Sequence, residues 1–117
     1  MSEQPTIAYK VLTADQMAAL ERDGTFAGAP VDLDDGYIHL STEAQLSETV
    51  AKHFAGKDDL HIAAIDLGSF GASLKWEESR GGQLFPHLYG PLPLETVIAY
   101  GPLKHDHEGA IRLPVAG

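Results

Sequence analysis

The sequence predicts one α+β domain, and three observations lead to that prediction. The 117 residues suffice for a single core and are too few for two ordinary ones. Hydrophobic residues make up 44% of the chain and charged residues 21%, which is typical of a folded protein. Short β-rich segments alternate with two segments of helical periodicity, each opened by a capping motif. We therefore expect residues 1–117 to form one domain, with an ordered core over about 6–103 and a polar tail over 104–117.

Charge and composition narrow the classes of partner. Acidic residues number 17 against 8 Lys and Arg, which gives a formal charge of −9, and the basic residues are scattered singly. Because nucleic-acid binding draws on clustered Lys and Arg, we expect no nucleic-acid partner, while a small anionic ligand stays open. The absence of cysteine excludes disulfides and thiol nucleophiles. No segment has the pattern of a signal peptide or a membrane span, so we expect a cytoplasmic protein without a membrane partner.

The first third of the chain predicts a strand, a helix and a loop. Ile7–Leu12 is rich in β-formers and stops at Thr13, which forms a capping-box pattern with Gln16. A helix is therefore expected over Ala14–Arg22, ended by the Asp-Gly pair that follows. Residues 25–36 (TFAGAPVDLDDG) have no sustained period, so we expect a loop that borders the site.

A strand and a second helix follow, and they place polar groups together. Tyr37–Ser41 (YIHLS) alternates, so that Ile38 and Leu40 point to the core and the other three side chains to the opposite face. A capping-box pattern then opens a helix over Glu43–Phe54, whose apolar stripe recurs every four residues. The strand therefore delivers its polar face close to a helix N-terminus, which favours a phosphate or a carboxylate.

The second half of the chain consists mainly of strand patterns. Leu60–Asp66 is almost continuously apolar, as in a central strand, although its period alone also fits a short buried helix. Leu74–Glu78 and Leu84–Tyr89 predict a hairpin or an open loop, and Pro86 is expected to make the second strand an edge or a bulge. Val97–Tyr100 predicts the last strand. The residues predicted to form the core are Val11, Leu20, Ile38, Leu40, Leu46, Val50, Phe54, Ile62, Ile65 and Val97.

Two five-residue segments share one pattern and locate the candidate site. YIHLS and FPHLY, at residues 37–41 and 85–89, both contain an aromatic residue, an apolar residue, His, Leu and a hydroxyl residue. In a strand the first, third and fifth side chains share a face. If the two strands lie near each other, the result is a cleft that suits a nucleotide or another planar polar ligand. The candidate catalytic residues are His39 and His87. The candidate ligand-binding residues from these segments are Tyr37, Ser41, Phe85 and Tyr89.

Ordinary structural roles compete with this interpretation. A strand histidine is commonly satisfied by a backbone carbonyl, and the aromatic residues Tyr37, Phe85 and Trp76 are more typical of core packing than of ligand stacking. Glu77 and Glu78 are typical of a solvated pair, although either is a candidate catalytic carboxylate. The HDHE run at residues 105–108 contains groups that bind Zn or Ni, but a flexible acidic tail is the expected structure.

Three longer segments resemble a known family. YKVLTADQ (9–16), DDGYIHLST (34–42) and GGQLFPHLYGPL (81–92) are similar to the bacterial domain of unknown function 952 family, and the likeness runs from about Tyr9 to Leu103. It implies a small cytoplasmic α+β protein and brings no established activity. More distantly, the order of strands and helices resembles the RNA 2'-phosphotransferase branch of the ADP-ribosyltransferase superfamily. That resemblance implies a small single-domain split or strongly bent mixed sheet with two main helices.

The second resemblance also implies a nucleotide site. ADP-ribosyltransferases bind NAD in the cleft of a split sheet, with a polar residue on the first strand, an aromatic or Ser-Thr segment on the second and a catalytic residue on a late strand. By position these fall on Lys10, on His39 with Ser41 and Thr42, and on His87 with Tyr89. Lys10 would pair with a phosphate, and His87 would act as acid, base or hydrogen-bond donor. The chain departs from the superfamily in having Lys10 where His or Arg is usual and His87 where many transferases have Glu.

Three hypotheses about function remain open at this stage. The chain is an ADP-ribosyl-transfer enzyme acting on NAD or a nucleotide-like substrate, or a non-catalytic small-molecule-binding module with the same cleft. As a third alternative it is a metal-dependent enzyme that uses two His with Asp32, Asp34 or Asp35 as a third ligand. No metal site is predicted, and NAD enters only as the substrate that the resemblance implies. We predict that His39 and His87 face one solvent-accessible cleft, close enough for one small ligand to touch both.

Overall fold

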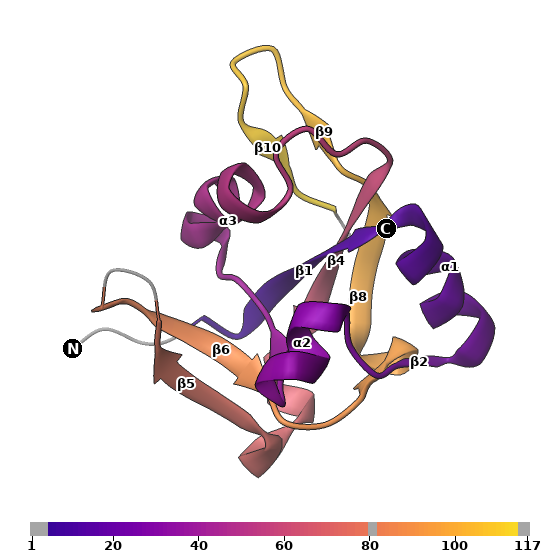
Figure 1. Cartoon of the computed structure of the whole chain (residues 1–117), viewed down its shortest axis with the longest axis vertical. Helices are drawn as coiled ribbons and strands as arrows, with labels where there is room; N and C mark the ends of the chain where they lie inside the picture. The colour runs from indigo at the N-terminus through magenta and orange to yellow at the C-terminus, as the bar shows by residue number, and fades with distance from the viewer. Residues whose placement is uncertain (1–4, 80–81, 115–117) are drawn as a thin grey trace.

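Two three-stranded antiparallel sheets form the framework of the computed structural model, which describes residues 5–79 and 82–114 (Figure 1). The first sheet has the order β1-β4-β8, formed by Ile7–Thr13, Leu60–Asp66 and Val97–Pro102. The second has the order β3-β6-β5, formed by Ile38–His39, Leu84–Leu88 and Leu74–Glu78. An isolated bridge joins them, because Tyr9 N–H donates to the Ser41 carbonyl at 2.7 Å and Ser41 N–H to the Tyr9 carbonyl at 2.9 Å. All strand pairs among the described residues are antiparallel, so the expectation of a mixed sheet is wrong.

Two main helices cover the two faces of the first sheet, which confirms the predicted α+β class. α1 (Ala14–Asp23) begins at the predicted capping box, with Gln16 N–H donating to Thr13 Oγ1 at 3.1 Å. α3 (Leu46–His53) follows a 3-10 turn over Glu43–Gln45. Side chains alternate along β1 and β4, so that one set packs with α1 and the other with α3. The first set is Ala8, Leu12, Ala63 and Ile65 with Met17 and Leu20, and the second is Tyr9, Val11, Ile62 and Ala64 with Leu46.

A short helix, α2 (Pro30–Asp35), occupies the segment predicted as a loop, so that prediction is wrong. Pro30 stands at the first helical position, where the missing N–H of proline costs no helical hydrogen bond. Asp32 Oδ2 accepts from Ala29 N–H at 2.8 Å, and Gly36 ends the helix with a left-handed φ of 88°. Six residues are too few to display a helical period, which is why the pattern did not reveal the helix.

β6 is the central strand of the second sheet, although Pro86 predicted an edge strand or a bulge. The Pro86 carbonyl accepts from Leu40 N–H at 3.1 Å, so the proline nitrogen, which carries no hydrogen, faces the same side. That side belongs to β3, which ends at His39. The missing donor therefore falls beyond the end of a short strand, and the pairing of β6 with β5 continues through Pro86 and Trp76.

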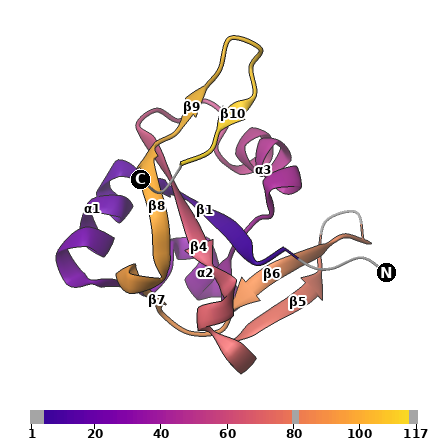
Figure 2. The ribbon, with the colours of Figure 1, turned by 180° about the vertical axis from the view of Figure 1, so that it is seen from behind.

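Several smaller elements complete the fold, and they were not predicted. β2 (Thr25–Phe26) pairs with β7 (Leu92–Pro93), and β9 (Lys104–His105) pairs with β10 (Ile111–Arg112). The second pair forms a hairpin within the segment predicted as a polar tail, and Figures 1 and 2 show it next to α3. Short 3-10 turns lie at Leu67–Ser69, Gly71–Ser73 and Leu94–Thr96.

The predicted core is mostly buried in the structure. Val50, Phe54 and Val97 are the exceptions, because they are only partly buried and pack against the edge of a core cluster. The buried members are Val11, Leu20, Ile38, Leu40, Leu46, Ile62 and Ile65. Within the described parts of the chain, no helix has the length and apolar character needed to cross a bilayer.

Candidate functional site

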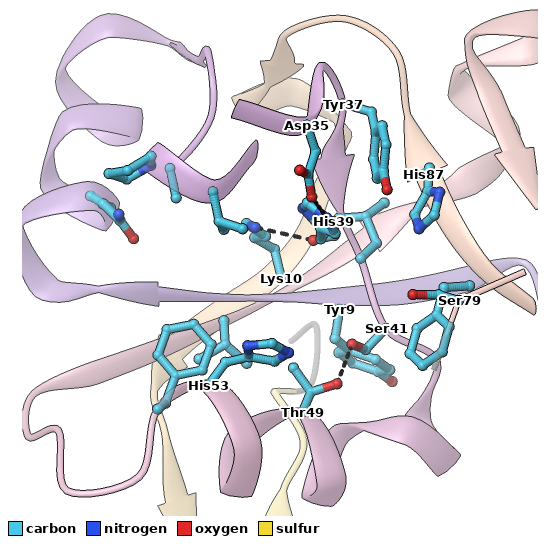
Figure 3. Close-up of a pocket in the computed structure, with 18 of the residues that line it drawn as sticks. Tyr9, Lys10, Asp35, Tyr37, His39, Ser41, Thr49, His53, Ser79 and His87 are labelled. Atoms are coloured by element: carbon cyan, nitrogen blue, oxygen red, sulfur yellow. Dashed lines mark hydrogen bonds and ion pairs between the residues drawn. The ribbon is translucent and has the colours of Figure 1, made fainter. Parts of the chain in front are cut away.

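A groove with a volume of about 510 Å³ lies at the junction of the two sheets. We call it the α2–α3 groove, because these helices flank it while β1, β3 and β6 supply further side chains. Figure 3 shows His39 and His87 on one side of β1, and Thr49 and His53, carried by α3, on the other. Six of the eight predicted site residues line the groove, and Thr42 and Tyr89 do not. Those six are Lys10, Tyr37, His39, Ser41, Phe85 and His87.

His39 and His87 are direct cross-strand partners. β3 pairs with β6 so that His39 lies opposite His87, and the centroids of the two rings are 5.6 Å apart. The Tyr37 ring contacts both, at 4.0 Å from His87 in a stacked arrangement and at 4.6 Å from His39. The two imidazoles are therefore close enough for one small ligand to reach both. Their exposure differs, since the side chain of His39 is 31% exposed and that of His87 only 3%.

Both ring nitrogens of His39 face carboxylates. Nδ1 lies 2.6 Å from Asp32 Oδ1, and Nε2 lies 2.9 Å from Asp35 Oδ2. Ionised carboxylates only accept hydrogen bonds, and an imidazole donates from both nitrogens only in its charged form. The ring therefore lies between two carboxylates, one buried in the fold and one near the surface. Asp35 also lines the α2–α3 groove.

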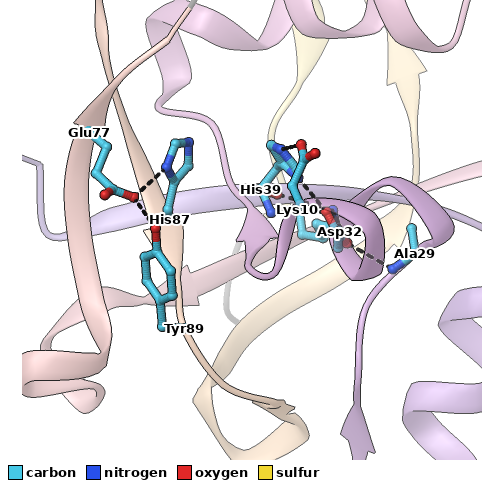
Figure 4. Close-up of polar contacts among 8 residues, drawn as sticks. Lys10, Ala29, Asp32, His39, Glu77, His87 and Tyr89 are labelled. Carbon is cyan, nitrogen blue, oxygen red and sulfur yellow. Dashed lines mark hydrogen bonds and ion pairs between the residues drawn. The ribbon is translucent and has the colours of Figure 1, made fainter.

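A buried ion pair lies directly beneath His39. Lys10 Nζ donates to Asp32 Oδ2 at 3.0 Å, to Asp32 Oδ1 at 3.2 Å and to the His39 carbonyl at 3.1 Å. Asp32 also accepts from Ala29 N–H and His39 N–H (Figure 4). Burial by itself raises the pKa of Asp32, but the hydrogen bonds from His39 and the charge of Lys10 hold it well below its usual range. Lys10, predicted to pair with a ligand phosphate, thus has its ammonium committed to Asp32 and His39.

His87 is held by a different carboxylate. Its Nδ1 lies 2.9 Å from Glu77 Oε1 on the neighbouring strand β5, and the same oxygen accepts from the Tyr89 hydroxyl at 2.6 Å (Figure 4). These hydrogen bonds, from Tyr89 first and then from His87, hold the pKa of Glu77 below its usual range. The hydrogen bond to Glu77 in turn raises the pKa of Tyr89 to about 12. Tyr89, predicted to bind a ligand, therefore does not line the groove itself and instead contacts Glu77 and the groove residue Tyr37.

The other predicted residues have structural contacts. Ser41 Oγ lies 2.9 Å from Thr49 Oγ1, which joins the segment after β3 to α3. Thr42 N–H donates to Gln45 Oε1 at 3.0 Å, so Thr42 opens the 3-10 turn as its capping pattern indicated. Phe85 is buried and adds apolar surface to the groove wall.

Two carboxylates at this site were not assigned by the sequence analysis. Asp32 was named only as an alternative metal ligand, although a proline followed two residues later by an acid and then by glycine is a signature of a short capped helix. Glu77 and Glu78 could not be told apart. The hairpin register decides between them, because Glu77 lies diagonally across from His87 while Glu78 pairs with Leu84 at the strand end.

The contacts do not favour the metal-dependent hypothesis. Within residues 5–79 and 82–114, no three His, Cys, Asp or Glu side chains are grouped so that they could hold a metal ion. Asp32 and Asp35 approach opposite nitrogens of His39 rather than converging with His87 on one point, and Asp34 is exposed.

The fold and the groove define a small α+β protein in which two antiparallel sheets meet at a pair of histidines. Over residues 11–100 the chain matches the family described as "Protein of unknown function (DUF952)", and it belongs to that family. The crystal structure of protein CC0527 from Caulobacter crescentus is 44% identical, with a TM-score of 0.83 over 92% of this chain and 95% of that one. Its solution NMR structure is 43% identical, with a TM-score of 0.77 over 92% and 91%. No curated protein matches the chain.

Proposed function

We propose that the α2–α3 groove binds NAD or a related nucleotide and that the chain catalyses a reaction of the ADP-ribosyl-transfer type. The observation that carries this proposal is the cross-strand pair of His39 and His87, which share the groove with the ring of Tyr37. An aromatic ring beside two imidazoles offers a planar, hydrogen-bonding surface of the kind that a nucleobase or nicotinamide needs. A small molecule is favoured over nucleic acid, because the chain carries a formal charge of −9.

The arrangement of the sheets supports the same proposal. The resemblance to ADP-ribosyltransferases implied a split sheet whose first, second and late strands converge on the ligand. Here β1 and the segment after β3 are joined by a single bridge at Tyr9 and Ser41. Lys10 on β1, His39 on β3 and His87 on β6 all line the groove at that junction.

The proposed chemistry follows from these positions. The bond between the nicotinamide nitrogen and ribose C1' breaks, its electron pair stays on the nitrogen, and nicotinamide leaves as a neutral molecule. An acceptor oxygen then bonds to C1', and its proton passes to the imidazole of His87. The carboxylate of Asp35, which lines the groove, supplies negative charge toward the positive character that develops on the ribose.

One observation favours a second function, that of a non-catalytic binding module with the same ligand. The ammonium of Lys10 is committed to Asp32 and to the His39 carbonyl, so it acts inside the fold rather than on a ligand phosphate. In this second function the two histidines orient the ligand and no bond is broken. The two functions predict the same binding and differ in the release of nicotinamide.

The experiment combines a titration with a product assay. Calorimetry with NAD, ADP-ribose and nicotinamide would be run on the wild type and on His39→Gln and His87→Gln, with His107→Gln as the matched control because His107 is fully exposed on the β9–β10 hairpin. We expect NAD to bind the wild type and the control, and both groove variants to bind at least about tenfold more weakly. Chromatographic detection of released nicotinamide would distinguish the transferase from the binding module. Absence of binding by all three ligands would contradict both.

A further inference from the structure

We infer that Glu77 is a positioning residue for His87: it fixes the imidazole with its proton on Nδ1, so that Nε2 is the atom that accepts a proton in the groove. The inference rests on the proposed function for its catalytic consequence. The position of the proton on His87 concerns the ligand-free protein, and we infer it from contacts between side chains of β5 and β6.

The contact between the two side chains is directional. His87 Nδ1 lies 2.9 Å from Glu77 Oε1, and a carboxylate that is ionised can only accept, so Nδ1 must carry the hydrogen. The Tyr89 hydroxyl donates to the same oxygen at 2.6 Å and holds the carboxylate in place. The ring of Tyr37 stacks on the imidazole, with the two centroids 4.0 Å apart. A neutral imidazole held in this way has an unprotonated Nε2.

The second imidazole of the groove cannot take the same role. His39 has a carboxylate on each nitrogen, Asp32 on Nδ1 and Asp35 on Nε2, so neither nitrogen is open to a ligand atom. His87 has a carboxylate on Nδ1 alone, and among the described residues its Nε2 has no hydrogen-bond partner. The groups that face the pair are therefore three carboxylates, arranged so that both nitrogens of His39 are occupied and Nε2 of His87 is open to accept a proton. This assigns the acid–base work in the groove to His87.

The proton released in the proposed transfer step is taken up by His87 and then passes to water. As the acceptor oxygen bonds to ribose C1', its proton moves to His87 Nε2 and the ring becomes a cation. Nδ1–H then forms a charged hydrogen bond with Glu77, which stabilises that cation without itself taking the proton. The proton returns to water when the product leaves. Glu77 thus acts through His87 and does not line the groove.

The deciding measurement is the tautomer of His87 in the ligand-free protein. Long-range ¹H–¹⁵N NMR spectra distinguish a protonated from an unprotonated ring nitrogen, and His87→Gln assigns the signal among the six histidines of the chain. At a pH where the ring is neutral, we expect the proton on Nδ1 in the wild type and loss of that preference in Glu77→Ala. Glu78→Ala is the matched control, because Glu78 is the adjacent exposed carboxylate of the same strand, and it should leave the tautomer unchanged.

A conservative variant separates positioning from folding. The amide oxygen of Glu77→Gln can still accept from Nδ1, so we expect this variant to keep the wild-type tautomer and thereby rescue the loss seen in Glu77→Ala. With NAD, nicotinamide release by Glu77→Ala should fall about tenfold or more in kcat with little change in KM. A wild-type proton on Nε2, or a tautomer unaffected by Glu77→Ala, would overturn the inference. Because the tautomer is read without ligand, failure of NAD to bind contradicts the proposed function alone.

Discussion

The two histidines of the groove occupy matching positions in the sequence but different electrostatic surroundings. His39 lies above a buried network in which Asp32, with a residue exposure of 1%, accepts from Lys10 and from both the ring and the backbone of His39. His87 is itself buried, but its carboxylate partner Glu77 is 38% exposed and is held by a surface tyrosine. The network around His39 and Asp32 is therefore part of the protein interior. The network around His87 and Glu77 extends from the interior to the surface.

This difference indicates that the burial of the carboxylate, rather than the burial of the histidine, determines whether a network contributes mainly to stability or to chemistry. A buried ion pair resists change, because removing one partner leaves an uncompensated charge away from water. A half-exposed carboxylate can lose a hydrogen bond at little cost to the fold. We therefore expect substitutions around Asp32 to act on stability and substitutions around Glu77 to act on chemistry.

The largest effect should come from Asp32→Asn. The variant removes the negative charge opposite the buried ammonium of Lys10, and we expect it to lower the free energy of unfolding by about 3–5 kcal/mol. Denaturant unfolding followed by circular dichroism would measure the change. Asp34→Asn is the control, because Asp34 is exposed on the same helix and should change stability little. If Asp32→Asn lowered the free energy of unfolding as little as Asp34→Asn, Asp32 would not belong to a network that stabilises the interior.

A double substitution sharpens this result. Replacing both members of the pair, as Lys10→Met with Asp32→Leu, removes both buried charges together and leaves apolar side chains of similar size. We expect the double variant to be more stable than Lys10→Met or Asp32→Leu alone, which the same denaturant series would show. Additive losses would mean that Lys10 and Asp32 stabilise the fold independently.

The pH dependence of stability tests the same network. The pKa of Asp32 is depressed in the folded protein, so its stabilising contribution is present above the unfolded value near 3.8 and is lost as the pH falls below it. Wild-type stability should therefore decline between about pH 4 and pH 2 more steeply than that of Asp32→Asn, so that the two curves converge. Asp34→Asn should keep the wild-type slope. Parallel curves for the wild type and Asp32→Asn would place the acid sensitivity elsewhere.

The sequence predicted which side chains form the polar face of this site, but it did not predict the contacts that hold them in place. Alternation in YIHLS and FPHLY placed His39 and His87 on matching strand positions, because a period of two is a local property of the backbone. The long strands and the two capped helices were predicted for the same reason. The pattern could not predict how the strands pair. Pro86 indicated an edge strand, but β6 takes the central position because β3 ends before it reaches the proline.

The contacts of the carboxylates were not predicted, because their partners are distant in the sequence. Asp32 meets Lys10 across 22 residues, and Glu77 meets His87 across a turn whose register is not fixed by composition. Lys10 shows the consequence. The resemblance to ADP-ribosyltransferases implied a phosphate partner for it, but its ammonium contacts an aspartate from a helix of only six residues. Local patterns predict on which face of a strand a side chain lies. The charged side chains of this site are paired through contacts with residues that are distant in the sequence.

The outer network should have a much smaller effect on stability. Because Glu77 lies on the surface of the β5–β6 hairpin, we expect Glu77→Gln to lower the melting temperature by only a small fraction of the shift that Asp32→Asn produces. Differential scanning calorimetry of the two variants under one buffer would give the ratio. Equal shifts would remove the distinction between the inner and outer networks, because Glu77 would then be as important to the fold as Asp32.

The finest test of the outer network is the titration of a tyrosine. The hydrogen bond from Tyr89 to Glu77 raises the pKa of Tyr89 to about 12, because ionising the phenol would break that bond and set two negative charges side by side. In Glu77→Ala both of these causes disappear while burial still raises the pKa, so the pKa of Tyr89 should fall from about 12 toward its ordinary value of about 10. Ultraviolet titration, with Tyr89→Phe to identify the signal, would measure the shift. Tyr100 provides the control, since its pKa is raised by a hydrogen bond to Glu21 and should respond to Glu21→Gln but not to Glu77→Ala. If Tyr89 titrates near 10 in the wild type, Glu77 is not held by the phenol, and the carboxylate would be free to leave His87.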